Sequence, residues 1–181
     1  MPGCEIRRML PHEIAEVVRM WRRSRDAEQP WLEARMSHSA ADDLRFFRDV
    51  LAPRAEVWLA VADKAVLGLL ALQCGFVEQL YVEPSIQRTG VGRALLEQAR
   101  ALSPLGLELY THQRNRRARA FYEHFGFRPV AFGVSPAPEC EPDVRYAWSP
   151  SAAPSPRRGD RVNDFTQRPE PARYSALPRR T

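Results

Sequence analysis

Apolar residues recur along this chain with two periods, about 3.6 and about 2 residues, and each period predicts its own kind of element. Ile14, Val17, Val18 and Trp21 share one face of a helix that opens at Pro11. Further helices are predicted over residues 40–51, 90–102 and 115–125. Strands are predicted over residues 5–9, 57–62, 66–73, 76–82, 107–111, 128–132 and 142–148. The polar segment 24–37, which Pro30 interrupts, is expected to be a loop.

These elements follow the order β-α-α-β-β-β-α-β-α-β-β, which predicts an α/β fold with a mixed sheet and helices packed on it. Residues 1–148 are expected to form one domain. Residues 149–181 hold six prolines and seven arginines with few large apolar residues. Such a tail cannot bury enough surface to offset its ordering entropy, so we expect it to be disordered.

Charge and composition limit the partners. The formal net charge is +5, but the tail carries seven arginines against three acidic residues, which leaves the folded part close to neutral. Nucleic acid is therefore not the expected partner. No apolar run approaches the roughly 20 residues that span a membrane, and the N-terminus lacks a secretory pattern, so we expect a cytoplasmic protein. The three cysteines form no metal-ligand spacing and no disulfide framework, and no metal is expected.

A strand, a glycine loop and a helix follow one another over residues 78–102, with Gln-Arg-Thr-Gly-Val-Gly at 87–92. The first N–H groups of a helix lack intrahelical partners, and glycines let an anion approach them. Arg88 and Arg93 add positive charge there. No Gly-Lys-Ser/Thr follows, and no third glycine completes a dinucleotide fingerprint, so ATPase and Rossmann sites are excluded. A tight turn that binds nothing is the alternative.

The segment 115–127 reads Asn-Arg-Arg-Ala-Arg-Ala-Phe-Tyr-Glu-His-Phe-Gly-Phe. Asn115 and Tyr122 are seven residues apart and share a helix face, with Ala118 between them. A slim ligand fits such a stripe of polar, small and phenolic side chains. The alternative is that Tyr122 is an ordinary core aromatic.

Together these two segments resemble the GCN5-related N-acetyltransferase (GNAT) superfamily. Its motif A, Gln/Arg-x-x-Gly-x-Gly/Ala, is matched at 87–92, and its motif B, Asn-x-x-Ala-x-x-Phe-Tyr-x-x-x-Gly-Phe, is matched at 115–127. The element order also matches, over about residues 5–148, so the chain is identified as a small bacterial-type member. Motif A departs from many members by having Arg88-Thr89 where they have an Arg-Gly or Gly-Arg pair, but both required glycines are present.

The resemblance implies acetyl-CoA as co-substrate. Its pyrophosphate would bind the backbone N–H groups of 87–93, and its pantetheine arm would lie beside Leu80–Val82. A backbone N–H near Leu80 or Tyr81 would polarise the thioester carbonyl, and Tyr122 would protonate the leaving thiolate. The cofactor-binding residues so implied are Leu80, Tyr81, Val82, Gln87, Arg88, Thr89, Gly90, Val91, Gly92, Arg93, Asn115 and Tyr122.

Acyl transfer to an amine also needs a base, because a primary amine is mostly ammonium at pH 7. Glu78 is our candidate, since strand alternation places it on the face of Leu80 and Val82; a water relay is the alternative. Glu83, beyond the end of the strand, is a poorer candidate. Ribosomal-protein alanine N-acetyltransferases carry a base glutamate five residues before the motif B Asn. Tyr110 stands there in this chain, which argues against that sub-family.

The sequence thus predicts an acyltransferase that moves acetyl from acetyl-CoA to a primary amine of a small molecule or a peptide. The regions that would surround the acceptor are acidic and aromatic and suit a cationic amine, although they fit a solvated loop with packed indoles equally well. A non-catalytic acyl-CoA-binding regulatory module is the alternative function. A homodimer stays open. The residues considered around the acceptor are Trp21, Asp26, Glu28, Trp31, Glu33, Phe76, Tyr146 and Trp148.

Overall fold

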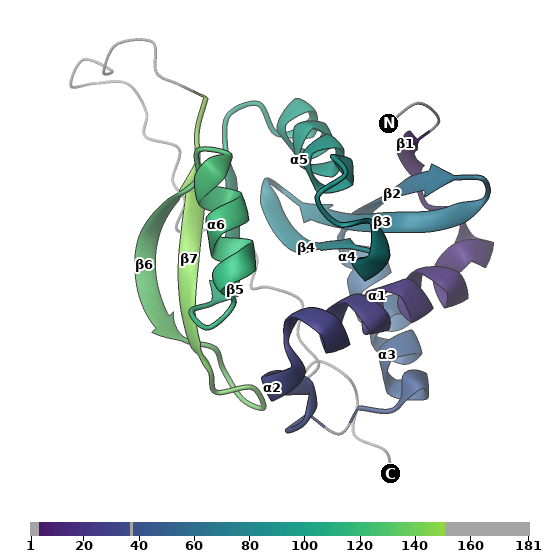
Figure 1. Cartoon of the computed structure of the whole chain (residues 1–181), viewed down its shortest axis with the longest axis horizontal. Coiled ribbons are helices and arrows are strands. Elements are labelled where there is room, and N and C mark those ends of the chain that lie inside the picture. Colours follow the sequence, from purple (N-terminus) through teal and green to yellow (C-terminus); the bar gives the residue numbers. More distant parts are fainter. Residues whose placement is uncertain (1–3, 37, 151–181) are drawn as a thin grey trace.

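The computed structural model describes residues 4–36 and 38–150, and a seven-stranded mixed sheet runs through it (Figure 1). Its spatial order is β1-β2-β3-β4-β5-β7-β6, and every neighbouring pair is antiparallel except β4 and β5. The strands are β1 (Glu5–Arg8), β2 (Glu56–Ala62), β3 (Ala65–Gln73), β4 (Phe76–Val82), β5 (Leu107–His112), β6 (Arg128–Val134) and β7 (Pro142–Trp148).

Helices connect these strands in the predicted order. A 3-10 turn, η1 (Pro11–Glu13), leads into α1 (Ile14–Glu28), and a second 3-10 turn, η3 (Pro84–Ile86), precedes α5. The other helical elements are α2 (Pro30–Glu33), α3 (Ala40–Phe46), the π-helical η2 (Phe47–Leu51), α4 (Ala52–Arg54), α5 (Val91–Leu102) and α6 (Arg116–His124). The first predicted helix corresponds to α1 with α2, and the second corresponds to α3 with η2 and α4. With this grouping the order of elements agrees with the order predicted from the sequence. The mixed α/β class is confirmed.

The sheet separates two apolar cores. On one face α5 and α6 pack on a cluster that includes Leu95, Leu107 and Tyr146. On the other face α1 and α3 cover the β1–β4 half, where Trp21 stacks on Phe46 with their ring centroids 6.0 Å apart. Figure 1 shows α5 and α1 on opposite sides of this half of the sheet. Two covered faces agree with the near-continuous apolar run of β3.

The loop predicted over residues 24–37 is wrong, because α1 continues to Glu28 and α2 follows after a single residue. Three of the polar side chains here, those of Ser24, Arg25 and Gln29, are buried and paired within the protein. The Ser24 hydroxyl donates to the carbonyls of Met20 and Val82 at 3.1 Å each. The Arg25 guanidinium bonds Glu33 at 2.6 Å and Asp43 at 3.2 Å. Hydrophobic periodicity misses a helix whose buried face is polar in this way.

β4 and β5 separate almost as soon as they meet. Their ladder holds one residue pair, Phe76 opposite Glu108, and the Glu108 N–H donates to the Gly75 carbonyl at 2.9 Å. On its other edge β4 stays paired with β3 as far as Val82. From Val77 onward the β5-facing edge of β4 therefore has no ladder partner on β5, and this opening positions the site described below.

β7 ends at Trp148, and the domain boundary predicted there stays a prediction. Of the tail that is expected to be disordered, 149–181, residues 151–181 lie outside the described part of the chain. Across residues 4–36 and 38–150, no helix is both long and apolar enough to cross a membrane. The cytoplasmic location and the homodimer stay predictions.

Candidate active site

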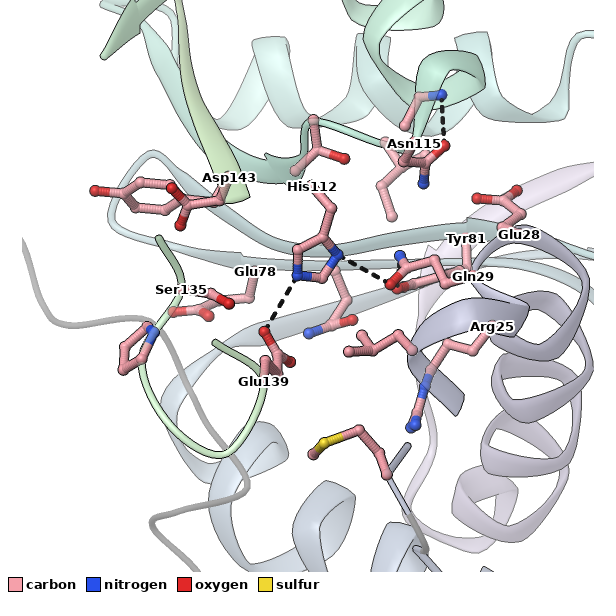
Figure 2. Close-up of a pocket in the computed structure, with 18 of the residues that line it drawn as sticks. Arg25, Glu28, Gln29, Glu78, Tyr81, His112, Asn115, Ser135, Glu139 and Asp143 are labelled. Atoms are coloured by element: carbon pink, nitrogen blue, oxygen red, sulfur yellow. Dashed lines mark hydrogen bonds and ion pairs between the residues drawn. The ribbon is translucent and has the colours of Figure 1, made fainter. Parts of the chain in front are cut away.

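A cavity of about 430 Å³ opens where β4 and β5 diverge. The end of α1, α2, one face of α6 and the connection from β6 to β7 complete its walls. Figure 2 shows side chains from all of these elements except α2 among its labelled residues, with His112 of β5 near the centre. The splayed strands thus leave room for a ligand between two parts of one sheet.

Asn115, Ala118 and Tyr122 all line this cavity, as their shared helix face predicts. The Asn115 side chain also caps α6, because its Oδ1 accepts from the Ala118 N–H at 3.0 Å. The Tyr122 ring packs edge-on against Phe121 and Phe127, with centroids 5.3 and 5.5 Å away. Burial raises the pKa of Tyr122 above its ordinary value, so the phenol is protonated at neutral pH.

Glu78, Leu80 and Tyr81 of β4 also line the cavity, but the argument that placed Glu78 there does not hold. Ala71 of β3 lies opposite Gln79 and Leu72 lies opposite Val77, so Glu78 is the extra residue of a β-bulge. The bulge breaks the alternation that was expected to put Glu78 on the face of Leu80 and Val82. Glu78 lines the cavity together with all the other residues from Phe76 to Tyr81, whereas Val82 is buried in the core.

The glycine loop and the first turn of α5 lie beside the cavity rather than in its wall. Gly90 is the residue before the helix, with a φ of 100°, and a Cβ built there would meet nothing within 4 Å. A Cβ on Gly92 would approach the Phe121 ring at 3.3 Å. The N–H groups of the first turn have no carbonyl within the helix to bond, so an anion can bind here.

The remaining predicted cofactor residues belong to this loop and turn. The Thr89 hydroxyl donates to the Ile86 carbonyl at 2.7 Å, and Arg93 pairs with Glu97 at 2.8 Å. Arg88 has a positive φ of 67°. Of the cofactor residues implied by the resemblance, Leu80, Tyr81, Asn115 and Tyr122 line the cavity, whereas Val82, Gln87, Arg88, Thr89, Gly90, Val91, Gly92 and Arg93 do not.

A hydrogen-bonded chain across the cavity escaped the sequence analysis. His112 Nε2 lies 3.3 Å from Glu139, and its Nδ1 lies 3.2 Å from the Gln29 side-chain oxygen. The Gln29 amide in turn donates to the Tyr81 hydroxyl at 3.3 Å. Burial opposes ionisation of Glu139, but the hydrogen bond and charge of His112, with Ser135 and Arg25, outweigh it and lower the pKa of that carboxyl. The nearest sequence signal was a histidine at the end of a strand, three residues before the motif B Asn.

Carboxylates predominate among the charged groups that line the cavity. Glu28, Glu33, Glu78, Glu139 and Asp143 line it, against a single arginine, Arg25, and two histidines. The Arg25 guanidinium is itself neutralised by the carboxylates of Glu33 and Asp43. A cavity of this composition attracts a cation.

Of the residues expected around the acceptor, Trp21, Glu28, Glu33 and Phe76 line the cavity, whereas Asp26, Trp31, Tyr146 and Trp148 do not. Trp148 packs instead against Phe127, with centroids 6.4 Å apart. Glu83 also lies outside the cavity, where it pairs with Arg23 at 2.6 Å. Glu108 pairs with Arg145 at 2.7 Å.

Comparisons with known proteins agree with this fold. A family model described as "Acetyltransferase (GNAT) domain" matches residues 53–129. The peptidyl-lysine N-acetyltransferase YjaB of Escherichia coli strain K12 is 32% identical over 124 residues, or 68% of this chain and 81% of that protein. The solution structure of apo-form YjaB from Escherichia coli matches with a TM-score of 0.67 at 27% identity, covering 80% of this chain and 96% of that one.

A crystal structure of the PaiA N-acetyltransferase of Thermoplasma acidophilum in complex with coenzyme A shares the fold, with a TM-score of 0.60 at 18% identity over 81% of this chain and 99% of that one. The chain belongs to the GNAT family. The resemblance found in its two motifs is confirmed, and so is the expectation of an acetyltransferase enzyme.

Proposed function

We propose that the protein transfers acetyl from acetyl-CoA to a primary amine, and that the amine is a lysine side chain presented by a peptide. The observation that carries the proposal is the opening between β4 and β5, with Tyr122 on one wall and an acidic cavity beyond it. The coenzyme A complex of a protein with the same fold, and the peptidyl-lysine activity in the name of YjaB, support it.

In this proposal the cofactor binds along the opening between β4 and β5. Its pyrophosphate binds the N–H groups of residues 87–93 at the positive end of the α5 dipole. Its pantetheine arm lies along the β5-facing edge of β4, where no ladder partner on β5 competes for hydrogen bonds. A backbone N–H at Leu80 or Tyr81 donates to the thioester oxygen and stabilises the charge that develops on it.

The transfer then follows directly. The amine nitrogen, after losing a proton, bonds to the carbonyl carbon, and the bond from carbon to sulfur breaks as the tetrahedral intermediate collapses. Glu78, directly or through one water, accepts the proton from the ammonium. Tyr122 gives its proton to the departing thiolate, and the second proton, which the nitrogen loses as the amide forms, returns through solvent to the phenolate. Both side chains reach the cavity, and the Tyr122 phenol is protonated at neutral pH, as a proton donor must be.

The acceptor's charge favours lysine. The carboxylates that line the cavity attract the ammonium, and a lysine side chain is long enough to carry its nitrogen from a surface peptide into a recess. Tyr110, 45% exposed at the rim, offers an aromatic surface to the alkyl stem.

A peptide assay tests the proposal. Acetyl-CoA is mixed with a peptide that has blocked termini and one lysine, and free thiol is followed together with the peptide mass. We expect thiol release matched by one acetyl group per lysine. A twin peptide with ε-acetyl-lysine in that place is the control and should give no turnover. Coenzyme A binding without thiol release across peptides and small amines would instead indicate the non-catalytic module.

A further inference from the structure

Glu28, the last residue of α1, lies where the two GNAT motifs meet. Gln87 of the motif A loop donates its side-chain N–H to the Glu28 carboxylate at 2.7 Å. The Asn115 side chain, at the start of the motif B helix, lies near this carboxylate and lowers its pKa. Figure 2 shows Glu28 and Asn115 on the same side of the cavity. A single carboxylate therefore bonds an amide of one motif and lies near an amide of the other.

Gln87 and Asn115 both belong to the residues that the resemblance assigns to coenzyme A. The cofactor offers their side-chain amides acceptors of the same chemistry as a carboxylate, namely phosphate oxygens and pantetheine carbonyls. The Glu28 carboxylate occupies the Gln87 amide in the structure, and its negative charge opposes a cofactor that carries several negative charges. The sequence analysis predicted no contact between Glu28 and the cofactor residues, and placed Glu28 only among the residues around the acceptor.

We propose that Glu28 is an internal competitor for the acyl-CoA site: its carboxylate holds the Gln87 amide, beside Asn115, until the cofactor displaces it. The inference rests on the proposed use of acetyl-CoA. Glu28 is a positioning residue here and takes no part in the transfer. Gln29 follows Glu28 directly and bonds His112. Displacement of Glu28 therefore also shifts the hydrogen bond between Gln29 and His112 on the acceptor side of the cavity.

The competition has a pH signature. Burial is the largest influence on Glu28 and raises its pKa in spite of the amides and the charge of Arg117. The charged and titratable groups that interact with it, among the residues that the structure describes, are Arg117 and Tyr122 of α6 and Tyr81 of β4. Bound phosphates raise this pKa further, so cofactor binding takes up a proton, and affinity rises as the pH falls.

The test is coenzyme A binding to the full chain by calorimetry between pH 5.5 and 8.5. Glu28→Gln keeps the size and an acceptor oxygen but removes the charge. We expect it to bind coenzyme A about three- to tenfold more tightly than the wild type at pH 8. The advantage should shrink as the pH falls and Glu28 becomes protonated. The titration of the cofactor's own phosphates affects both proteins equally, so it cancels in the ratio of the dissociation constants of the wild type and the variant.

Asp26→Asn is the matched control, because Asp26 is an exposed carboxylate on the same helix. It should bind coenzyme A as the wild type does. Equal or weaker binding by Glu28→Gln, with an unchanged pH profile, overturns the inference and assigns Glu28 a merely structural role. If the wild type itself binds no coenzyme A, the proposed function fails as well, so the two failures are distinguishable.

Discussion

Replacing Tyr122 by Phe removes one hydroxyl from the centre of the proposed site and leaves the packing of the ring in place. The ring is held between Phe121 and Phe127, with Tyr146 at 6.3 Å, and phenylalanine keeps all three contacts. We therefore expect the free energy of unfolding to change by less than about 1 kcal/mol. Any large loss of activity then reports on the hydroxyl itself.

The magnitude follows from the leaving group. General acid catalysis contributes roughly 10²- to 10⁴-fold. A thiol pKa of about 8.5 lies close to the assay pH, so the thiolate departs with modest help and the lower end applies. We expect kcat to fall about 100-fold, equivalent to about 2.7 kcal/mol of transition-state stabilisation. The affinity for coenzyme A should not change, since the proposed role begins only as the carbon–sulfur bond breaks.

The assay is thiol release under saturating acetyl-CoA and lysine peptide, with coenzyme A binding measured separately. Tyr146→Phe is the matched control, since this tyrosine belongs to the same core but its hydroxyl donates to Glu123 and accepts from Arg119. It should lose about 1 kcal/mol of stability and keep kcat. A kcat for Tyr122→Phe within about threefold of the wild type would refute the acid role.

Two further predictions concern stability. A Cβ on Gly68 would lie 2.8 Å from a Leu95 methyl carbon and 3.1 Å from the Tyr81 carbonyl oxygen, so Gly68→Ala should cost about 2 kcal/mol and lower Tm by roughly 4–8 °C in a thermal melt. The hydrogen bonds of Arg7 lower the pKa of Glu13 from 4.5 to about 2. The Glu13 carboxylate therefore adds about 1 kcal/mol, after solvent screening, to the free energy of unfolding. This stabilisation is complete above pH 4.5 and is lost as the pH falls towards 2. Denaturant titrations across this range should show the loss in the wild type and not in Glu13→Gln.

Much of the fold could be predicted because it rests on local patterns. The strands 76–82 and 142–148 are observed with the predicted bounds, since apolar runs between turn residues report burial directly. The order of elements and the two motifs identified the family before any tertiary contact was known. The face shared by Asn115 and Tyr122 is a property of helix geometry alone, and both residues line the cavity.

Other features depend on residues that are far apart in sequence. The bulge at Glu78 appears only when the register of β4 against β3 is known. The continuation of α1 through Arg25 depends on the carboxylates of Glu33 and Asp43, and a hydrophobic pattern carries no record of such pairing.

The sequence alone was enough to identify the family, the order of the elements and the two cofactor motifs, because periodicity and short motifs depend only on residues that are close together in the chain. Folding was needed to open β4 from β5, to bring Gln29 and Glu139 to His112, and to set Glu28 against Gln87. Hydrogen-bond partners 27, 59 and 83 residues apart meet through the packing of whole elements. No local pattern of apolar and polar residues specifies which distant side chain a polar group will meet.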